Sequence, residues 1–136
     1  MNILLKSATI VDPGNKHHLK KRDILIENGL IKKIGAKIIK SGNEEEISLP
    51  NLHVSKGWFD PSVSFGEPGF EERETIENGL NTASLSGFTE VAVNANSFPV
   101  TDNKANIQYL KSKANGHAVN LYPSTIIKNL FRIRIY

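Results

Sequence analysis

The sequence contains no cysteine among its 136 residues. Disulfide bonds, thiolate metal sites and thiol redox chemistry are therefore excluded. The sequence also has no glycine-rich phosphate-binding loop, no Gly-x-Ser-x-Gly nucleophile elbow and no recognisable pair of nucleophile and base. These absences remove several common kinds of active site from consideration.

Long apolar runs are missing as well. Only three apolar residues, Ile3 to Leu5, precede Lys6 at the start of the chain, and this is too short for the core of a signal peptide or for a membrane span. No segment repeats and none is of low complexity. A composition of 39% hydrophobic and 23% charged residues is typical of one ordinary soluble domain, and we expect it in the cytoplasm, away from membranes.

The formal net charge is +3. The lysines are scattered and alternate with apolar residues, as in Ile31-Lys32-Lys33-Ile34, which is the pattern of solvated strand faces. A nucleic-acid interface would gather the basic residues with aromatic side chains for base stacking. We therefore expect no nucleic-acid partner.

The first third of the chain reads as short strands and turns. Residues 12–15, Asp-Pro-Gly-Asn, form a strong turn signal. A strand over residues 23–27 meets Asn28-Gly29, the preferred pair for a type I′ hairpin turn, and residues 30–34 return antiparallel. A further strand is expected over residues 47–54, at a sheet edge because it contains Pro50.

Residues 57–70 divide the chain into two halves. Trp58, Phe59, Val63 and Phe65 predict a strand, and the loop that follows leads to an acidic helix start at Glu71 and Glu72. This order is the first unit of a β/α fold, in which the carboxyl end of the strand carries the chemistry.

Two more strands and two helices are expected after residue 70. Apolar positions at helical spacing predict a helix that Gly87 ends, and Gly79 inside it indicates a close packing contact, because glycine costs about 1 kcal/mol relative to alanine there. Residues 88–93 read as a buried parallel strand. Asp102 is expected to cap a second helix, and a third strand is expected over residues 118–122.

The stretch from Asp60 to Gly69 resembles the signature Asp-x-His-x-His-Phe-Arg-Glu-Pro-Gly of dihydroorotases, in the cyclic-amide branch of the amidohydrolases. The resemblance continues through residues 74–79, 83–89 and 96–103. It implies an α/β fold and a family reaction, the hydrolysis of the cyclic amide of dihydroorotate to carbamoyl-aspartate in pyrimidine biosynthesis.

The resemblance also implies two parts in the chain. Residues 1–54 would form part of a small N-terminal β-sandwich, and residues 55–136 the first two to three β/α units of a (β/α)8 metal-dependent hydrolase barrel. A complete barrel needs about 250 residues. We therefore expect an incomplete, truncated barrel, and the alternating residues 130–136 are interpreted as a strand or, preferably, as the tail of a truncated reading frame.

The residues that bind metal in the family are the ones that differ here. In a strand, residues i and i+2 point the same way, so a His-x-His pair aims two imidazoles at one ion. Ser62 and Ser64 stand at these positions, and neutral hydroxyls are poor zinc ligands. Gly66 stands where the family has a substrate-binding arginine, and Asn120 where some relatives have a carboxylated, metal-bridging lysine. Although the family uses zinc, we predict no cofactor, no metal site and no catalytic residue.

Four polar residues that match the family remain, and each has two interpretations. Asn96 matches the substrate-contacting asparagine and is the candidate substrate-binding residue, but residues 94–99 are rich in turn formers and a turn role stays open. Asp60 would belong to the site or satisfy backbone donors at a strand end. Glu67 would be an acid/base group or a loop-ordering carboxylate. Asp102 would be a site residue or only a helix cap.

The histidines offer no replacement site. His17 and His18 lie among lysines in a predicted loop, and His53 and His117 have no partner at i+2 or i+4.

Three functions follow as hypotheses. The first is a dihydroorotase-like protein that is catalytically inactive, a pseudoenzyme. The second is a non-catalytic structural partner of aspartate transcarbamoylase, or a self-associating protein, since exposed strand edges seek partners. The third is a non-functional truncated remnant without a stable fold.

Overall fold

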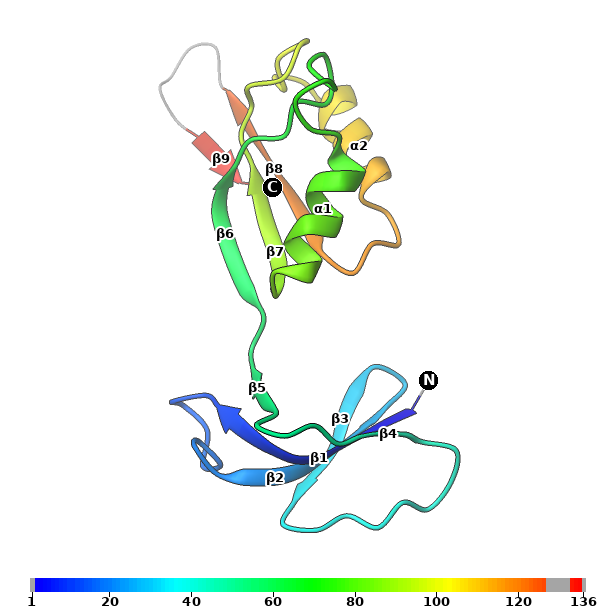
Figure 1. The fold of residues 1–136 in the computed structure, drawn as a ribbon. Helices are drawn as coiled ribbons and strands as arrows, with labels where there is room; N and C mark the ends of the chain where they lie inside the picture. Colours follow the sequence, from blue (N-terminus) through cyan, green and yellow to red (C-terminus); the bar gives the residue numbers. More distant parts are fainter. Residues whose placement is uncertain (1, 127–132, 136) are drawn as a thin grey trace. The chain divides into compact units, whose positions relative to one another are not determined.

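The computed structural model describes residues 2–126 and 133–135 (Figure 1). The chain divides into two compact units, Met1–Lys56 and Gly57–Tyr136. Each unit has its own sheet and its own cluster of buried apolar side chains.

The first unit is a five-stranded sheet built around β1 (Asn2–Val11). On one side, β1 pairs antiparallel with β2 (Lys21–Glu27), which pairs antiparallel with β3 (Leu30–Gly35). On the other side, β4 (Glu45–Ile47) and β5 (His53–Ser55) pair with β1, both parallel to it.

Local sequence explains the turns of this unit. Asn28 and Gly29 join β2 to β3 with φ angles of 51° and 77°, so the predicted type I′ turn is confirmed. The prediction of one continuous strand over residues 47–54 is wrong. Pro50 and Asn51 form a turn between β4 and β5, because Pro50 has no N–H to donate to a ladder and Asn51 adopts a φ of 59°.

A buried carboxylate organises the same unit. Asp23 on β2 is 2% exposed and accepts hydrogen bonds from the ammonium of Lys6 and from the backbone N–H groups of Ser7 and Ile38, the last two at 2.9 and 2.8 Å. Ser7 lies where the β1–β2 register shifts, with a φ of 52°. Burial acts to raise the pKa of Asp23, but these hydrogen bonds and the Lys6 charge together lower it.

The second unit has a four-stranded sheet in the order β6-β7-β8-β9. The first three strands, β6 (Trp58–Val63), β7 (Phe88–Val93) and β8 (Asn120–Ile126), are parallel. Figure 1 shows both helices of the unit against the same face of this sheet. The alternation of strands and helices and the parallel pairing are those expected for the first units of a β/α barrel.

The first helix, α1 (Ile76–Leu85), begins later than its acidic residues suggest. A start at Glu71 and Glu72 is wrong: these residues lie in a turn. Thr75 caps the helix by accepting a hydrogen bond from the backbone N–H of Asn78. Gly87 follows the helix with a φ of 87°, as predicted.

The second helix, α2 (Lys104–Lys113), is capped by Asn103 and not by Asp102. The side chain of Asn103 accepts a hydrogen bond of 3.0 Å from the backbone N–H of Asn106. Both residue types are good caps, so the sequence allowed either one. Neither α1 nor α2, each of 10 residues, is long and apolar enough to cross a membrane, and no other helix lies in the described part of the chain.

Gly79 confirms the close contact that its sequence position indicates. A Cβ atom built on Gly79 would lie 2.3 Å from Cε1 of the buried Phe65 ring. The core around this contact consists of Phe65, Ile76, Leu80, Val91, Val93, Leu110, Val119 and Leu121. Gly79 therefore lets α1 approach the residue that follows β6.

We expect Gly79→Ala to lower the free energy of unfolding. The gain in helix propensity of about 1 kcal/mol is opposed by overpacking that costs about 1–3 kcal/mol. Urea denaturation would measure the difference, with the exposed Ser84→Ala on the same helix as the control. In the Phe65→Leu background the cost should shrink, and a stabilised Gly79→Ala protein would refute the contact.

The end of the chain adds a short strand, β9 (Ile133–Ile135). It pairs antiparallel with β8, joining Ile133 to Ile126 and Ile135 to Ser124. Of the two interpretations of residues 130–136, the strand is therefore seen over Ile133–Ile135. The rest of that prediction lies outside the described residues.

Candidate functional site

The positions of the expected metal ligands lie at the carboxyl end of β6. Ser62 is the last residue but one of β6, and Ser64 directly follows the strand. Asn94 and Asn96 follow the neighbouring parallel strand β7. Because parallel strands end at the same edge of a sheet, the four side chains gather there.

These four residues form a hydrogen-bonded group, here called the serine–asparagine cluster. The Nδ2 atom of Asn94 donates to Oγ of Ser62 at 3.2 Å and to Oγ of Ser64 at 3.3 Å. The Nδ2 atom of Asn96 donates to Oγ of Ser64 at 3.0 Å. Asn94 is half-buried and the other three residues are exposed. The cluster thus adds side-chain hydrogen bonds to the backbone bond that joins the ends of β6 and β7, from the N–H of Asn94 to the carbonyl of Val63.

The donor set of the cluster does not fit zinc. A zinc site needs imidazole, thiolate or carboxylate ligands, and the cluster offers hydroxyls and amides. The Ser64 hydroxyl oxygen also accepts two N–H groups, so both of its lone pairs are engaged. Across residues 2–126 and 133–135, no group of three or more histidine, cysteine, aspartate or glutamate side chains is placed to hold a metal ion.

Gly66 has no room for a side chain. A Cβ atom there would lie 1.8 Å from the carbonyl oxygen of Phe70 and 3.2 Å from Cβ of Arg73. The loop is closed on itself at this point, since the N–H of Gly66 donates to the carbonyl of Glu74 and the N–H of Phe70 donates to the carbonyl of Gly66. The arginine expected from the family could not occupy this loop as it stands.

Glu67 orders the structure around this loop. Its carboxylate is 6% exposed and accepts from the backbone N–H of Ile76 at 3.0 Å, the first residue of α1. It also accepts from the Tyr109 hydroxyl at 2.6 Å and pairs with the Lys113 ammonium at 2.8 Å, both on α2. These contacts connect the loop to both helices and favour the loop-ordering interpretation over an acid/base role.

The charges around Glu67 agree with that role. Burial acts to raise its pKa, but hydrogen bonds from Lys113, Tyr109 and Ile76 together lower it. The same contact with Glu67 raises the pKa of both Tyr109 and Lys113. Glu67 is therefore held as a carboxylate and is not poised to donate a proton near neutral pH.

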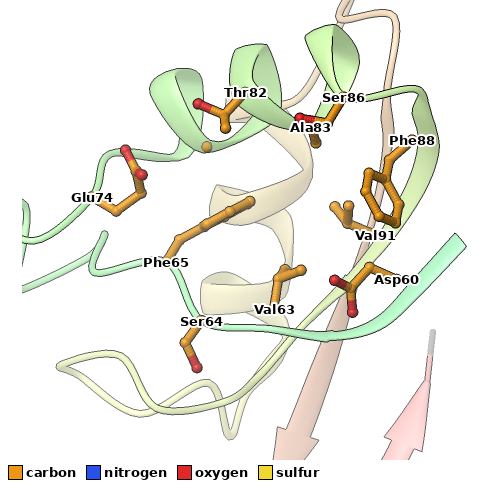
Figure 2. Close-up of a pocket in the computed structure, with 11 residues that line it drawn as sticks. Asp60, Val63, Ser64, Phe65, Glu74, Thr82, Ala83, Ser86, Phe88 and Val91 are labelled. Atoms are coloured by element: carbon orange, nitrogen blue, oxygen red, sulfur yellow. The ribbon is translucent and has the colours of Figure 1, made fainter.

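The Asp60 carboxylate hydrogen-bonds the backbone near the end of its own strand, β6. Its Oδ1 atom accepts from the backbone N–H of Ser62 at 2.9 Å, as expected for a carboxylate that satisfies backbone donors. Asp60 also borders a cavity of about 230 Å³ between β6 and α1 (Figure 2). Figure 2 shows the apolar side chains of Phe65, Phe88 and Val91 around this cavity, and Ser64 pointing away from them. Ser64 is nevertheless one of the residues that line the cavity, so the cavity and the serine–asparagine cluster share this residue.

Asn120 lies at the wrong end of its strand for a metal-bridging position. It is the first residue of β8 and pairs with Glu90, whereas the cluster lies beyond Val93. At about 3.3 Å per residue, Asn120 is too far from the carboxyl edge. The match of Asn120 to the bridging lysine is therefore wrong, because β8 runs on to Ile126.

The rings of His18, His53 and His117 have hydrogen-bond partners within the protein. Nδ1 of His18 accepts from the N–H of Asp12 at 3.1 Å, and Nδ1 of His53 lies 2.6 Å from the carbonyl oxygen of Asn51. The His117 ring bonds the side chain of Asn81 and the N–H of Val119. Burial and the neighbouring Lys16 charge lower the pKa of His17.

Sequence reasoning missed Asn94. It follows an apolar strand two residues before Asn96, the same spacing that separates Ser62 from Ser64. Matching pairs at the ends of adjacent parallel strands were a usable signal, because residues i and i+2 share a side.

Known proteins resemble this chain in sequence. No family model matches. A curated dihydroorotase of Geobacter metallireducens is 38% identical over 125 residues, which are 90% of this chain and 29% of that protein. A dihydroorotase of Pelotomaculum thermopropionicum is 39% identical over 123 residues, 90% of this chain and 28% of that protein. The chain therefore spans less than a third of the length of these relatives.

Solved structures resemble it in fold. An L-hydantoinase (dihydropyrimidinase) from Arthrobacter aurescens superposes with a TM-score of 0.76 at 20% identity, over 89% of this chain and 27% of that one. A D-hydantoinase gives 0.74 at 23% identity, over 96% and 28%. A dihydroorotase gives 0.61 at 18% identity, over 91% and 30%.

Proposed function

Because this chain belongs to the dihydroorotase family, as a counterpart of its N-terminal portion, we propose that it is a dihydroorotase-like protein that does not catalyse the family reaction. That reaction is the hydrolysis of the cyclic amide of dihydroorotate to carbamoyl-aspartate, in pyrimidine biosynthesis. The proposed location is the cytoplasm.

The serine–asparagine cluster is the observation that supports this proposal. The family reaction requires a metal-activated hydroxide, and a metal requires ligands that displace its water. At the expected position the chain offers two hydroxyls and two amides that are bonded to one another. Gly66, in addition, supplies no guanidinium for the substrate carboxylate. Asn96 is the residue proposed to retain a ligand contact.

Metal content and turnover test the proposal together. We expect the purified protein to contain substoichiometric zinc and to show no hydrolysis of dihydroorotate above a buffer blank. A metal-replete dihydroorotase, prepared in the same way, serves as the positive control. Stoichiometric zinc with turnover that a chelator abolishes would contradict the proposal.

A second candidate is a structural partner of aspartate transcarbamoylase, or of a second copy of this chain. It is favoured by exposed aromatic residues on β6, where Trp58 is 60% and Phe59 is 46% exposed. Within the described residues β6 pairs only with β7, which leaves one edge of the strand open. Open edges and apolar side chains favour association. Co-purification with a transcarbamoylase would support this candidate, and a non-cooperative thermal transition would favour the non-functional remnant.

A further inference from the structure

We propose that Asn94 is a positioning residue that joins the ends of β6 and β7 directly, a link that needs no metal ion. This inference rests on the proposed function, which assigns no metal ion to this edge. It adds that the side-chain amide of Asn94 holds the ends of β6 and β7 together, a role that the family resemblance does not give to this residue.

The backbone ladder between the two strands is interrupted near this edge. The β6–β7 register shifts between Asp60 and Val63. Pro61 lies within the shifted segment and has no N–H to donate. Beyond the shift, the N–H of Asn94 donates to the carbonyl of Val63 at 2.9 Å. The backbone pairing of the two strands is therefore irregular just before their ends, where side-chain hydrogen bonds can add to it.

The amide of Asn94 supplies such hydrogen bonds. A primary amide has two N–H donors, and Asn94 directs its nitrogen at both serine hydroxyls, at 3.2 and 3.3 Å. These bonds join residues 32 and 30 positions apart in the sequence. Asn96 adds a third bond to Ser64. Asn94 is the member that contacts both serines, and it is half-buried.

The serines fit this role better than histidines would. Their hydroxyls are short and lie on the same side of the strand end, within reach of one amide. Each hydroxyl oxygen accepts an N–H from an asparagine amide. The hydroxyls at the expected imidazole positions and the amide of Asn94 thus form one hydrogen-bonded arrangement.

Hydrogen exchange with the variant Asn94→Leu tests the proposal. Leucine is similar in size to asparagine and removes every hydrogen bond of the side-chain amide. We expect the protection factor of the residue 94 amide, which is corrected for the intrinsic rate, to fall about tenfold, as for the loss of one or two hydrogen bonds. Protection of the Val91 amide should stay unchanged. The exposed Asn115→Leu is the matched control.

A double-mutant cycle separates this role from general packing. The double variant Ser62→Ala/Ser64→Ala removes only the two hydroxyls, and it should reduce the protection factor of the residue 94 amide by a similar factor. The same double change should have little further effect in the Asn94→Leu protein. Ser62→Thr/Ser64→Thr, which keeps both hydroxyls, should preserve protection. Additive effects, or unchanged protection in Asn94→Leu, would overturn the proposal.

A metal arm distinguishes failure of this inference from failure of the proposed function. Exchange of the unaltered protein is repeated with chelator and with added zinc, and we expect no difference. Protection that depends on zinc would overturn both proposals. Zinc-independent protection that Asn94→Leu leaves intact would overturn only the positioning role.

Discussion

Replacing Asp23 by alanine is expected to lower the free energy of unfolding by about 3–5 kcal/mol, the range for removing one partner of a buried ion pair. The change leaves the Lys6 ammonium without its carboxylate and the N–H of Ile38, a buried residue, without its acceptor. It also releases Ser7, whose left-handed backbone is held by Asp23. Urea denaturation followed by circular dichroism would measure the loss.

The control for Asp23 is Glu46→Ala, which removes an exposed carboxylate from β4 in the same unit. Because folding lowers the pKa of Asp23, its contribution is complete above the unfolded pKa of about 3.9 and is lost as the pH falls through the folded value. The Asp23→Ala protein should therefore lose less stability on acidification. An unchanged unfolding midpoint at neutral pH would show that Asp23 does not organise its unit.

Replacing Glu67 by alanine is expected to cost about 2–4 kcal/mol, since hydrogen bonds to charged groups contribute about 1.5–3 kcal/mol each and Lys113 can regain water. The Lys113 side chain is half exposed, so its charge is not left buried. The first N–H of α1 and the Tyr109 hydroxyl lose their acceptor. Thermal and urea unfolding would measure the change, with the exposed Glu72→Ala as the control.

The pH dependence of the free energy of unfolding provides a second test of the role of Glu67. Its pKa is lowered on folding, so its stabilisation is present above the unfolded pKa of about 4.3 and is lost as the pH falls through the folded value. Below about pH 5 the difference in stability between the unaltered protein and Glu67→Ala should narrow. A difference that stays constant with pH would mean that packing, and not charge, accounts for the effect.

Features set by local residues were predictable from the sequence. The Asn28-Gly29 turn follows from two residues that tolerate positive φ, and the end of α1 follows from Gly87. The need for a close contact at Gly79 was also readable, because a glycine inside a helix requires a reason. The identity of its partner, Phe65, required the packing of α1 on the sheet.

Features set by distant residues could not be predicted in the same way. Glu67 lies 42 positions from Tyr109, and no local pattern indicates that the two meet. The serine positions were recognised by resemblance, but Asn94 was not, because its role depends on where β7 ends beside β6. The predicted starts of the two helices were wrong by one to a few residues. Near Glu71 and Asp102 several residues could each cap the helix, and the sequence does not show which one does.

The closed loop at Gly66 limits which substitutions this position accepts. A Cβ atom there would lie 1.8 Å from a backbone carbonyl, so any larger residue requires residues 66–74 to take another path. Substitution of arginine at position 66 would meet that obstacle, even in a protein that also carried histidines at positions 62 and 64. The path of the backbone therefore disfavours a guanidinium at this position, and an engineered arginine would need accompanying changes along residues 66–74.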